Sequence, residues 1–177
     1  DDPAASGRRS YPRKELLDPW AYAVSSALWD RRRAANPQDT TPSSLRAMVT
    51  APLPAAPARR RHADLANAVI YEMHVGGFTR HPSAAVAQPG CFAGLKQKIP
   101  YLTELGITHV ELLPVMAFDE QDVPPGVMAR GLRNYWGYST HSFWAPHPGY
   151  CSEPARGTQE FRDLVDALHA AGIGVIL

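Results

Sequence analysis

The order of apolar runs in the second part of this chain restricts its fold more than any other feature. β-rich runs at 69–75, 107–113 and 173–177 alternate with two stretches of helical periodicity, at 96–105 and 158–171. A Gly-Ile pair follows each helical stretch, which is typical of a helix that stops at a glycine and leads into a strand. Strands that alternate with helices in this way form parallel sheets. The sequence therefore predicts an α/β fold.

The two helical stretches each carry an apolar face. In the first, Pro100 is tolerable only near the start of the regular helix or at a kink, because proline lacks an amide hydrogen. We expect this helix to bury Ile99, Leu102 and Leu105. Apolar residues in the second stretch recur at i, i+3, i+4 and i+7, which predicts an amphipathic helix that buries Phe161, Leu164, Val165 and Leu168.

The connections that follow the strands are long, whereas those that follow the helices are short. The connection at 116–157 has about 40 residues, and connections of that length are usually functional. This asymmetry favours a (β/α)8 barrel, whose active site lies at the carboxyl ends of its strands. A doubly wound sheet stays open as an alternative, although no glycine-rich phosphate fingerprint follows Val75 or Leu113. Three strands cannot close a barrel, so we expect a partial (β/α)8 TIM barrel and a truncated sequence.

The first part of the chain is predicted to be mostly irregular. Residues 36–58 are rich in proline, which removes too many amide donors for regular structure and favours an extended linker or a meander on a neighbour. Asp18 could cap a short helix with Pro19 at its first position. The apolar face of that helix would consist of Trp20, Val24 and Leu28.

Composition and charge describe a soluble globular protein without an obvious polyanionic partner. The chain is 45% hydrophobic and 20% charged, and its net charge is +1. Arginine clusters at 31–33 and 59–61 are interpreted as solvated linker rather than as a nucleic-acid patch. No apolar run approaches the length of a membrane span and no signal peptide is evident, so a cytoplasmic protein is the default expectation.

The two cysteines, Cys91 and Cys151, both fall in predicted loops. Two cysteines make no disulfide framework, which fits a reducing compartment, although a single bridge stays open. Neither lies in a Cys-His pattern of the kind that activates a nucleophile.

The clearest candidate for function is the sequence Asn134-Tyr135-Trp136-Gly137-Tyr138, in the long connection after the second predicted strand. A glycine permits close approach of backbone and ligand, and aromatic faces suit the C–H-rich faces of sugar rings. The alternative is that these aromatics cover an edge of the core.

Other polar residues are interpreted mainly as structural. Glu72 and His74 are expected to form a satisfied pair, because a lone histidine beside one glutamate lacks a third metal ligand. Glu111 is also assigned a structural role, since a buried carboxylate needs a partner. The acidic stretch of Asp119, Glu120 and Asp122 lacks the spacing of a calcium loop, which favours a solvated loop face. His141 and His147, near Trp144, could line outer sugar subsites. No metal site and no cofactor are predicted.

Several of these stretches resemble a known family. Tyr71-Glu72-Met73-His74-Val75 with Gly77-Phe78-Thr79 resembles the first barrel strand and following loop of the α-amylase superfamily of glycoside hydrolases. Residues 106–115 resemble its second strand. Residues 134–140, with Phe143, Ala145 and Pro146, resemble the isoamylase and glycogen-debranching branch. Residues 16–21 are similar to the connector between an N-terminal carbohydrate-binding β-sandwich and the barrel in those enzymes.

The resemblance implies an organisation of the chain. Residues 1–66 would form the connector, and residues 67–177 the start of the catalytic barrel. The whole protein would debranch glycogen or starch by a retaining mechanism that uses two closely spaced carboxyl groups. In this family those carboxyl groups lie further along the chain, so the 177 residues would contain no catalytic residue and be inactive alone.

The resemblance also implies a substrate site. Tyr138 would stack under the glucose ring next to the scissile bond, while Asn134, Tyr135 and Trp136 shape the loop around a branched α-glucan. Alternative enzymes with similar strand motifs are glycogen branching enzymes and maltooligosyl-trehalose trehalohydrolases, but the long insertion at 116–133 favours debranching. A hypothesis of another class is a non-catalytic glucan-binding fragment.

Overall fold

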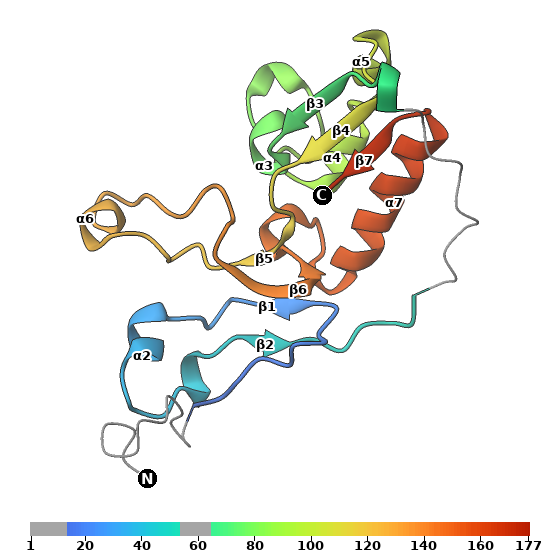
Figure 1. The fold of residues 1–177 in the computed structure, drawn as a ribbon. Helices are drawn as coiled ribbons and strands as arrows, with labels where there is room; N and C mark the ends of the chain where they lie inside the picture. The colour runs from blue at the N-terminus through green and yellow to red at the C-terminus, as the bar shows by residue number, and fades with distance from the viewer. Residues whose placement is uncertain (1–13, 54–64) are drawn as a thin grey trace.

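A parallel sheet forms the upper part of the molecule, as drawn in Figure 1, in the computed structural model, which describes residues 14–53 and 65–177. Its three strands are β3 (Ile70–Met73), β4 (His109–Leu112) and β7 (Gly174–Ile176), in the order β3-β4-β7. The pairing places Glu72 opposite Glu111, and Glu111 opposite Ile176. The predicted α/β fold with a parallel sheet is confirmed.

The first predicted helix is divided into two short ones. These are α4 (Phe92–Lys96) and α5 (Ile99–Glu104), and Pro100 lies in the first turn of α5, where its missing N–H costs no hydrogen bond. Leu102 is fully buried as predicted, but the prediction for Leu105 is wrong, because α5 ends before it and Leu105 is 49% exposed.

The second predicted helix is confirmed as α7 (Gly157–Ala170). Leu164 and Leu168 are fully buried, and Phe161 and Val165 are half-buried. The chain leaves the helix through Gly172, whose φ of +81° lies in the left-handed region that glycine adopts without strain.

The sheet has one covered face and one open face within the described residues. Side chains on the covered face pack with residues from the helices in a single apolar core that includes Met73, Val110, Leu112, Leu102, Leu164 and Leu168. On the opposite face Ile70 is 48% exposed, and Glu72 and Glu111 are exposed next to each other. Both carboxylates lie on this open face, and the structural role assigned to Glu111 stays a prediction.

The long connection after β4 contains a second sheet that the sequence did not predict. β5 (Met116–Phe118) pairs antiparallel with β6 (Thr140–Pro146), with irregular register between them. Between these strands an excursion that carries α6 (Pro125–Met128) extends away from the parallel sheet (Figure 1). The remaining short elements are α3 (Val75–Phe78), which follows β3, and 3-10 helices at Leu65–Asn67, Pro82–Ala84, Pro148–Tyr150 and Pro154–Arg156.

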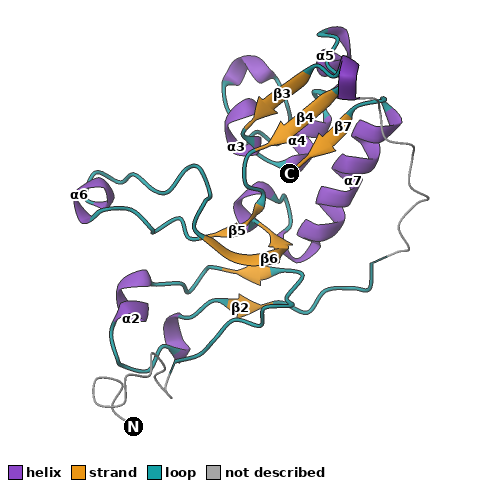
Figure 2. Cartoon of the chain, viewed as in Figure 1, coloured by secondary structure: helices purple, strands orange, loops and turns teal. Residues whose placement is uncertain are grey.

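The N-terminal segment, residues 14–53, lies along β6 (Figure 2). It contains β1 (Val24–Ser25), which pairs antiparallel with β2 (Arg46–Ala47), then α2 (Arg31–Ala35) and a 3-10 helix (Thr41–Ser43). A small apolar cluster joins it to the second sheet through Ala21, Val24, Leu45, Ala117 and Ala145.

The short helix expected after Asp18 is wrong. The Asp18 carboxylate accepts a hydrogen bond from the amide of Trp20, and the Asp18 carbonyl accepts one from the amide of Ala21. Such a turn satisfies the backbone locally and competes with helix formation. Of the three residues expected on one apolar face, Val24 is buried whereas Trp20 and Leu28 are exposed.

Two expectations lie partly or wholly outside the described residues. The arginine cluster at 59–61 and the end of the proline-rich stretch fall in 54–64, which the structure does not describe. The start of the predicted connector falls in 1–13, which it does not describe either. Within the described part of the chain, no helix is long and apolar enough to cross a membrane.

Leu102 and Leu105 allow a matched test of this packing. Leu102→Ala should lower the free energy of unfolding by about 2–5 kcal/mol, since it leaves a cavity among α4, α7 and the sheet. Leu105→Ala should change it by about 0.5 kcal/mol or less. Chemical denaturation monitored by far-UV circular dichroism measures both, and equal losses would contradict the assigned end of α5.

Candidate functional site

The aromatic motif at 134–138 lies at the carboxyl end of β3, where the chain turns back towards β6. Gly137 has a φ of +86°, in the left-handed region. A Cβ atom there would lie 3.0 Å from Cδ1 of Phe118 and 3.1 Å from Cβ of Pro114. Glycine is therefore required at this position for conformation and for packing.

An open cavity of about 770 Å³ lies between this motif and the end of β3. Aromatic residues make up half of its lining, which also contains one carboxylate and one imidazole. The lining consists of Tyr71, Glu72, Met73, His74, Gly77, Phe78, Leu113, Tyr135, Trp136 and Tyr138. Tyr138 is 73% exposed, so one face of its ring is free to contact a ligand. The aromatic walls of this open cavity present apolar ring faces to a ligand.

His74 holds Tyr135 in the wall of this cavity. The two rings stack with centroids 4.0 Å apart and an interplanar angle of 9°, and His74 Nε2 lies 2.7 Å from the Tyr135 carbonyl oxygen. His74 Nδ1 accepts a hydrogen bond from the Gly77 amide, which assigns the proton of the neutral ring to Nε2. Tyr150 Oη lies 3.0 Å from the same Nε2. The expected pair of His74 with Glu72 is wrong, because β3 ends before His74 and the ring turns towards the motif.

His147 lies beneath the motif rather than on the cavity wall. Its side chain is 3% exposed, and its ring stacks on Phe118 at a centroid distance of 3.8 Å. His147 Nε2 lies 3.1 Å from Oε1 of Glu120, and this hydrogen bond lowers the pKa of the Glu120 carboxyl. The structure therefore brings together Tyr135, Trp136 and Tyr138 at the cavity and places His147 behind them.

A second open cavity, of about 520 Å³, lies on the other side of Tyr138. It separates the motif from the N-terminal segment and is lined by Trp29, Arg31, Asp119, Asp122, Tyr138, Ser139, Thr140, His141 and Phe143. Burial lowers the pKa of His141, whose ring lies edge-on to Trp29. Tyr138 is thus shared by the two cavities.

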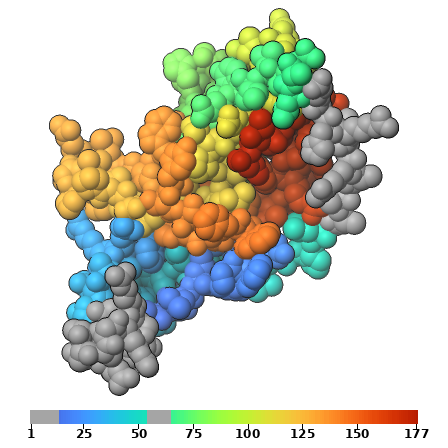
Figure 3. Space-filling view, in the orientation of Figure 1, coloured from blue at the N-terminus to red at the C-terminus, as the bar shows by residue number. Residues whose placement is uncertain are grey.

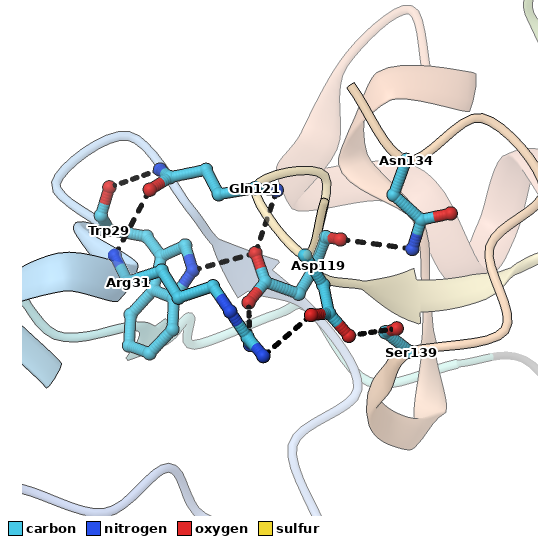
Figure 4. Close-up of polar contacts among 7 residues, drawn as sticks. Trp29, Arg31, Asp119, Gln121, Asn134 and Ser139 are labelled. Atoms are coloured by element: carbon cyan, nitrogen blue, oxygen red, sulfur yellow. Dashed lines mark hydrogen bonds and ion pairs between the residues drawn. The ribbon is translucent and has the colours of Figure 1, made fainter. Parts of the chain in front are cut away.

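The acidic stretch after β5 is only in part the solvated loop face that the sequence predicted: the Glu120 and Asp122 side chains are 45% and 38% exposed, whereas Asp119 is buried. The Asp119 side chain is 2% exposed and accepts hydrogen bonds from Trp29 Nε1 and Arg31 Nη1 (Figure 4). Arg31 also pairs with Asp122, so the interpretation of Arg31 as solvated linker is wrong as well. No local sequence signal predicts these contacts, because the donors and acceptors lie about 90 residues apart.

Other groups that could carry chemistry show no such arrangement. The described residues contain no group of three or more His, Cys, Asp or Glu side chains placed to hold a metal ion. Cys91 and Cys151 are free thiols, and burial raises the pKa of Cys151 to about 12. Burial also raises the pKa of Cys91, so neither thiol is set up as a nucleophile.

Comparison with known proteins agrees with the resemblance that the motifs indicate. The chain is similar to glycogen debranching enzymes over nearly its whole length. It is 40% identical over 189 residues to the glycogen debranching enzyme of Klebsiella pneumoniae (strain 342), an alignment that covers 99% of this chain and 28% of that protein. It is 38% identical over 195 residues to a glycogen operon protein GlgX homolog of Mycobacterium bovis. That alignment covers 99% of this chain and 26% of the relative. No protein-family model matches the chain.

Solved structures of a glycogen-degrading factor and of a pullulanase superpose on most of this chain. The product complex of the multi-modular glycogen-degrading pneumococcal virulence factor SpuA superposes with a TM-score of 0.67 at 27% identity, over 92% of this chain and 18% of that one. The pullulanase SAP of group B Streptococcus in complex with maltotetraose superposes with a TM-score of 0.66 at 30% identity. The match covers 92% of this chain and 22% of the pullulanase chain. The chain thus spans about a quarter of the length of the curated relatives that it matches.

The contacts of His74 predict how stability depends on pH. Burial is the main cause that lowers the pKa of His74 below its ordinary 6.5. The unfolded chain therefore binds a proton at a higher pH than the folded chain, and the free energy of unfolding should fall as the pH drops below 6.5. His74→Gln should reduce this dependence, and the exposed His81→Gln should not. Urea denaturation between pH 5 and pH 8 measures how the free energy of unfolding depends on pH. If this dependence is the same in His74→Gln as in the parent, the assigned burial effect on His74 is contradicted.

Proposed function

We propose that this chain is part of an enzyme that hydrolyses α-1,6 branch linkages in glycogen or a similar branched α-glucan, with retention of configuration. The observation that carries the proposal is the exposed ring of Tyr138 between two cavities, within a motif that resembles the debranching branch of the superfamily. The relatives at 40% and 38% identity, one named a glycogen debranching enzyme and the other a GlgX homolog, support debranching over the branching and trehalohydrolase alternatives.

The aromatic cavity suits an α-glucan chemically. Sugar rings present C–H groups on their faces and hydroxyl groups on their edges. The faces gain from contact with the exposed rings of Tyr138 and Trp136, while the carboxylate of Glu72 offers acceptors for the hydroxyls. A flat ring under the reacting sugar holds it for attack and shields the developing positive charge from water. We assign Tyr138 to sugar contact, Asn134, Tyr135 and Trp136 to the shape of the loop, and His147 to its support from behind.

The parallel sheet is proposed to be the first part of a (β/α)8 barrel. The helices cover one face, and the opposite face presents the exposed Ile70 and the neighbouring carboxylates of Glu72 and Glu111. A face with an exposed isoleucine is explained if further strands close the sheet around it, as the interior of a barrel requires. In this proposal residues 67–177 start the barrel, and residues 1–66 connect it to a β-sandwich.

The two reacting carboxyl groups would come from parts of the enzyme outside these residues. A retaining glycosidase needs a nucleophile and an acid/base about 5–5.5 Å apart on either side of the scissile bond. The family places both on later strands, so this chain would supply substrate contacts and would be inactive alone. The free thiols of Cys91 and Cys151 support a reducing, cytoplasmic location.

Substitution of Tyr138 in the complete enzyme tests the proposal. Tyr138→Ala should lower kcat/KM on branched glucan by roughly 10- to 100-fold, because a stacked and positioned sugar is lost. Tyr138→Phe keeps the ring and should stay within about threefold of the parent. Tyr22→Ala is the control, since Tyr22 is exposed and lines neither cavity. The measurement is the release of linear maltooligosaccharides.

The product analysis also separates the alternatives. Debranching releases linear chains and creates reducing ends, whereas a branching enzyme transfers chains without a net gain of reducing ends. Glucan binding by the complete protein with neither reaction would support the non-catalytic alternative and contradict the proposal.

A further inference from the structure

The N-terminal segment makes its strongest polar contact with the acidic turn at 119–122. The Arg31 guanidinium bridges two carboxylates, with Nη1 2.7 Å from Asp119 Oδ2 and Nη2 2.6 Å from Asp122 Oδ1 (Figure 4). The indole Nε1 of Trp29 donates to Asp119 Oδ1 at 2.9 Å. Arginine suits this position because its planar fork donates to two acceptors at once.

Gln121 adds a second set of contacts between the same two stretches. Its side-chain amide donates to the Trp29 carbonyl at 2.7 Å and accepts from the Arg31 amide at 3.0 Å. The Gln121 amide donates to Asp119 Oδ1 at 2.9 Å. Residues 29–31 and the acidic turn are thus joined through backbone as well as side chains, which fixes their relative position.

The acidic turn also forms hydrogen bonds at the start of the aromatic motif and directly after its end. At one end, Asn134 Nδ2 donates to the Asp119 carbonyl at 3.1 Å, and the Asn134 amide donates to the Glu120 carbonyl at 2.9 Å. At the other end, the Asp119 amide donates to the Ser139 carbonyl at 2.8 Å, and the Ser139 hydroxyl donates to Asp122 Oδ2 at 2.5 Å. Tyr138 immediately precedes Ser139, so the turn holds the backbone from which its exposed ring extends.

The burial of Asp119 makes this arrangement depend on Arg31. The Asp119 side chain is 2% exposed, so its charge is compensated by protein donors rather than by water. Removal of the guanidinium leaves a buried carboxylate with fewer donors, which favours a shift of the turn towards solvent. Such a shift moves Asn134 and Ser139 together, and with them Tyr138.

We propose that Arg31 is a positioning residue for the glucan site, which acts on Tyr138 through the acidic turn without itself taking part in the reaction. This inference rests on the proposed role of Tyr138. It assigns to the N-terminal segment a part in substrate recognition: the segment forms the far wall of the second cavity and sets the ring that separates the two cavities. The space-filling view shows the motif region, in orange, between this blue segment and the sheet (Figure 3).

Substitution of Arg31 in the complete debranching enzyme tests the inference. Arg31→Met removes the charge and both hydrogen bonds, and should lower kcat/KM on branched glucan by about 10-fold. Arg31→Lys keeps the charge but not the fork, and should recover part of the loss. Arg33→Met is the matched control on the same short helix, since Arg33 is 64% exposed and lies 3.7 Å from Asp30; it should stay within about twofold.

A double-mutant cycle distinguishes positioning from a purely structural role. If Arg31 acts through Tyr138, Arg31→Met should lower kcat/KM by less than about twofold when it is added to Tyr138→Ala. The reason is that the ring which Arg31 positions is already absent. An equal loss in both backgrounds would overturn the inference. So would an unchanged kcat/KM for Arg31→Met, even with a lowered Tm.

The same experiment separates this inference from the proposed function. If Tyr138→Ala leaves hydrolysis unchanged, the role assigned to Tyr138 is wrong and the inference falls with it. If Tyr138→Ala lowers activity while the Arg31 effect is additive or absent, the inference alone is overturned. Should Arg31→Met fail to fold, Arg31→Lys and Asp122→Asn carry the same cycle, since both keep the size of the side chain.

Discussion

The buried carboxylate of Asp119 is the constraint on which the candidate site depends. A charge that is 2% exposed must be matched by donors: Trp29 and Arg31 supply two from about 90 residues away, and the nearby Gln121 amide supplies a third. The backbone groups of the same residue bind Asn134 and Ser139. One buried group therefore joins the N-terminal segment to the aromatic motif. The end of β3 in the parallel sheet forms the wall of the first cavity that faces this motif.

The parallel sheet could be predicted because its signals are local. Apolar runs of strand length, amphipathic helices and glycines at the ends of helices all lie within short windows of sequence. The antiparallel pairing of β5 with β6 could not be predicted. The register between the two strands is irregular, β6 ends at Pro146, and no tight turn marks a hairpin. The sequence predicts the end of α5 too late, and it predicts a helix where a turn follows Asp18, because a capping residue and a turn residue carry the same local signal.

The candidate site was predicted in part for the same reason. The motif at 134–138 is contiguous, and its glycine and aromatic residues indicate close contact with the faces of sugar rings. The partners that position it were missed: His74 was paired with Glu72 by strand alternation, whereas β3 ends one residue earlier and His74 stacks on Tyr135. Arg31 was interpreted as linker because its partners, Asp119 and Asp122, lie far away in sequence. Long-range polar contacts leave no periodic trace, so sequence alone does not predict them.

The most direct test of the account is a crystal structure of the complete enzyme with a linear α-glucan oligosaccharide. We expect a sugar ring with its face parallel to the ring of Tyr138, at the boundary of the two cavities, and Arg31 still bridging Asp119 and Asp122. An oligosaccharide bound elsewhere, with the face of Tyr138 free or covered by another part of the protein, would contradict the account.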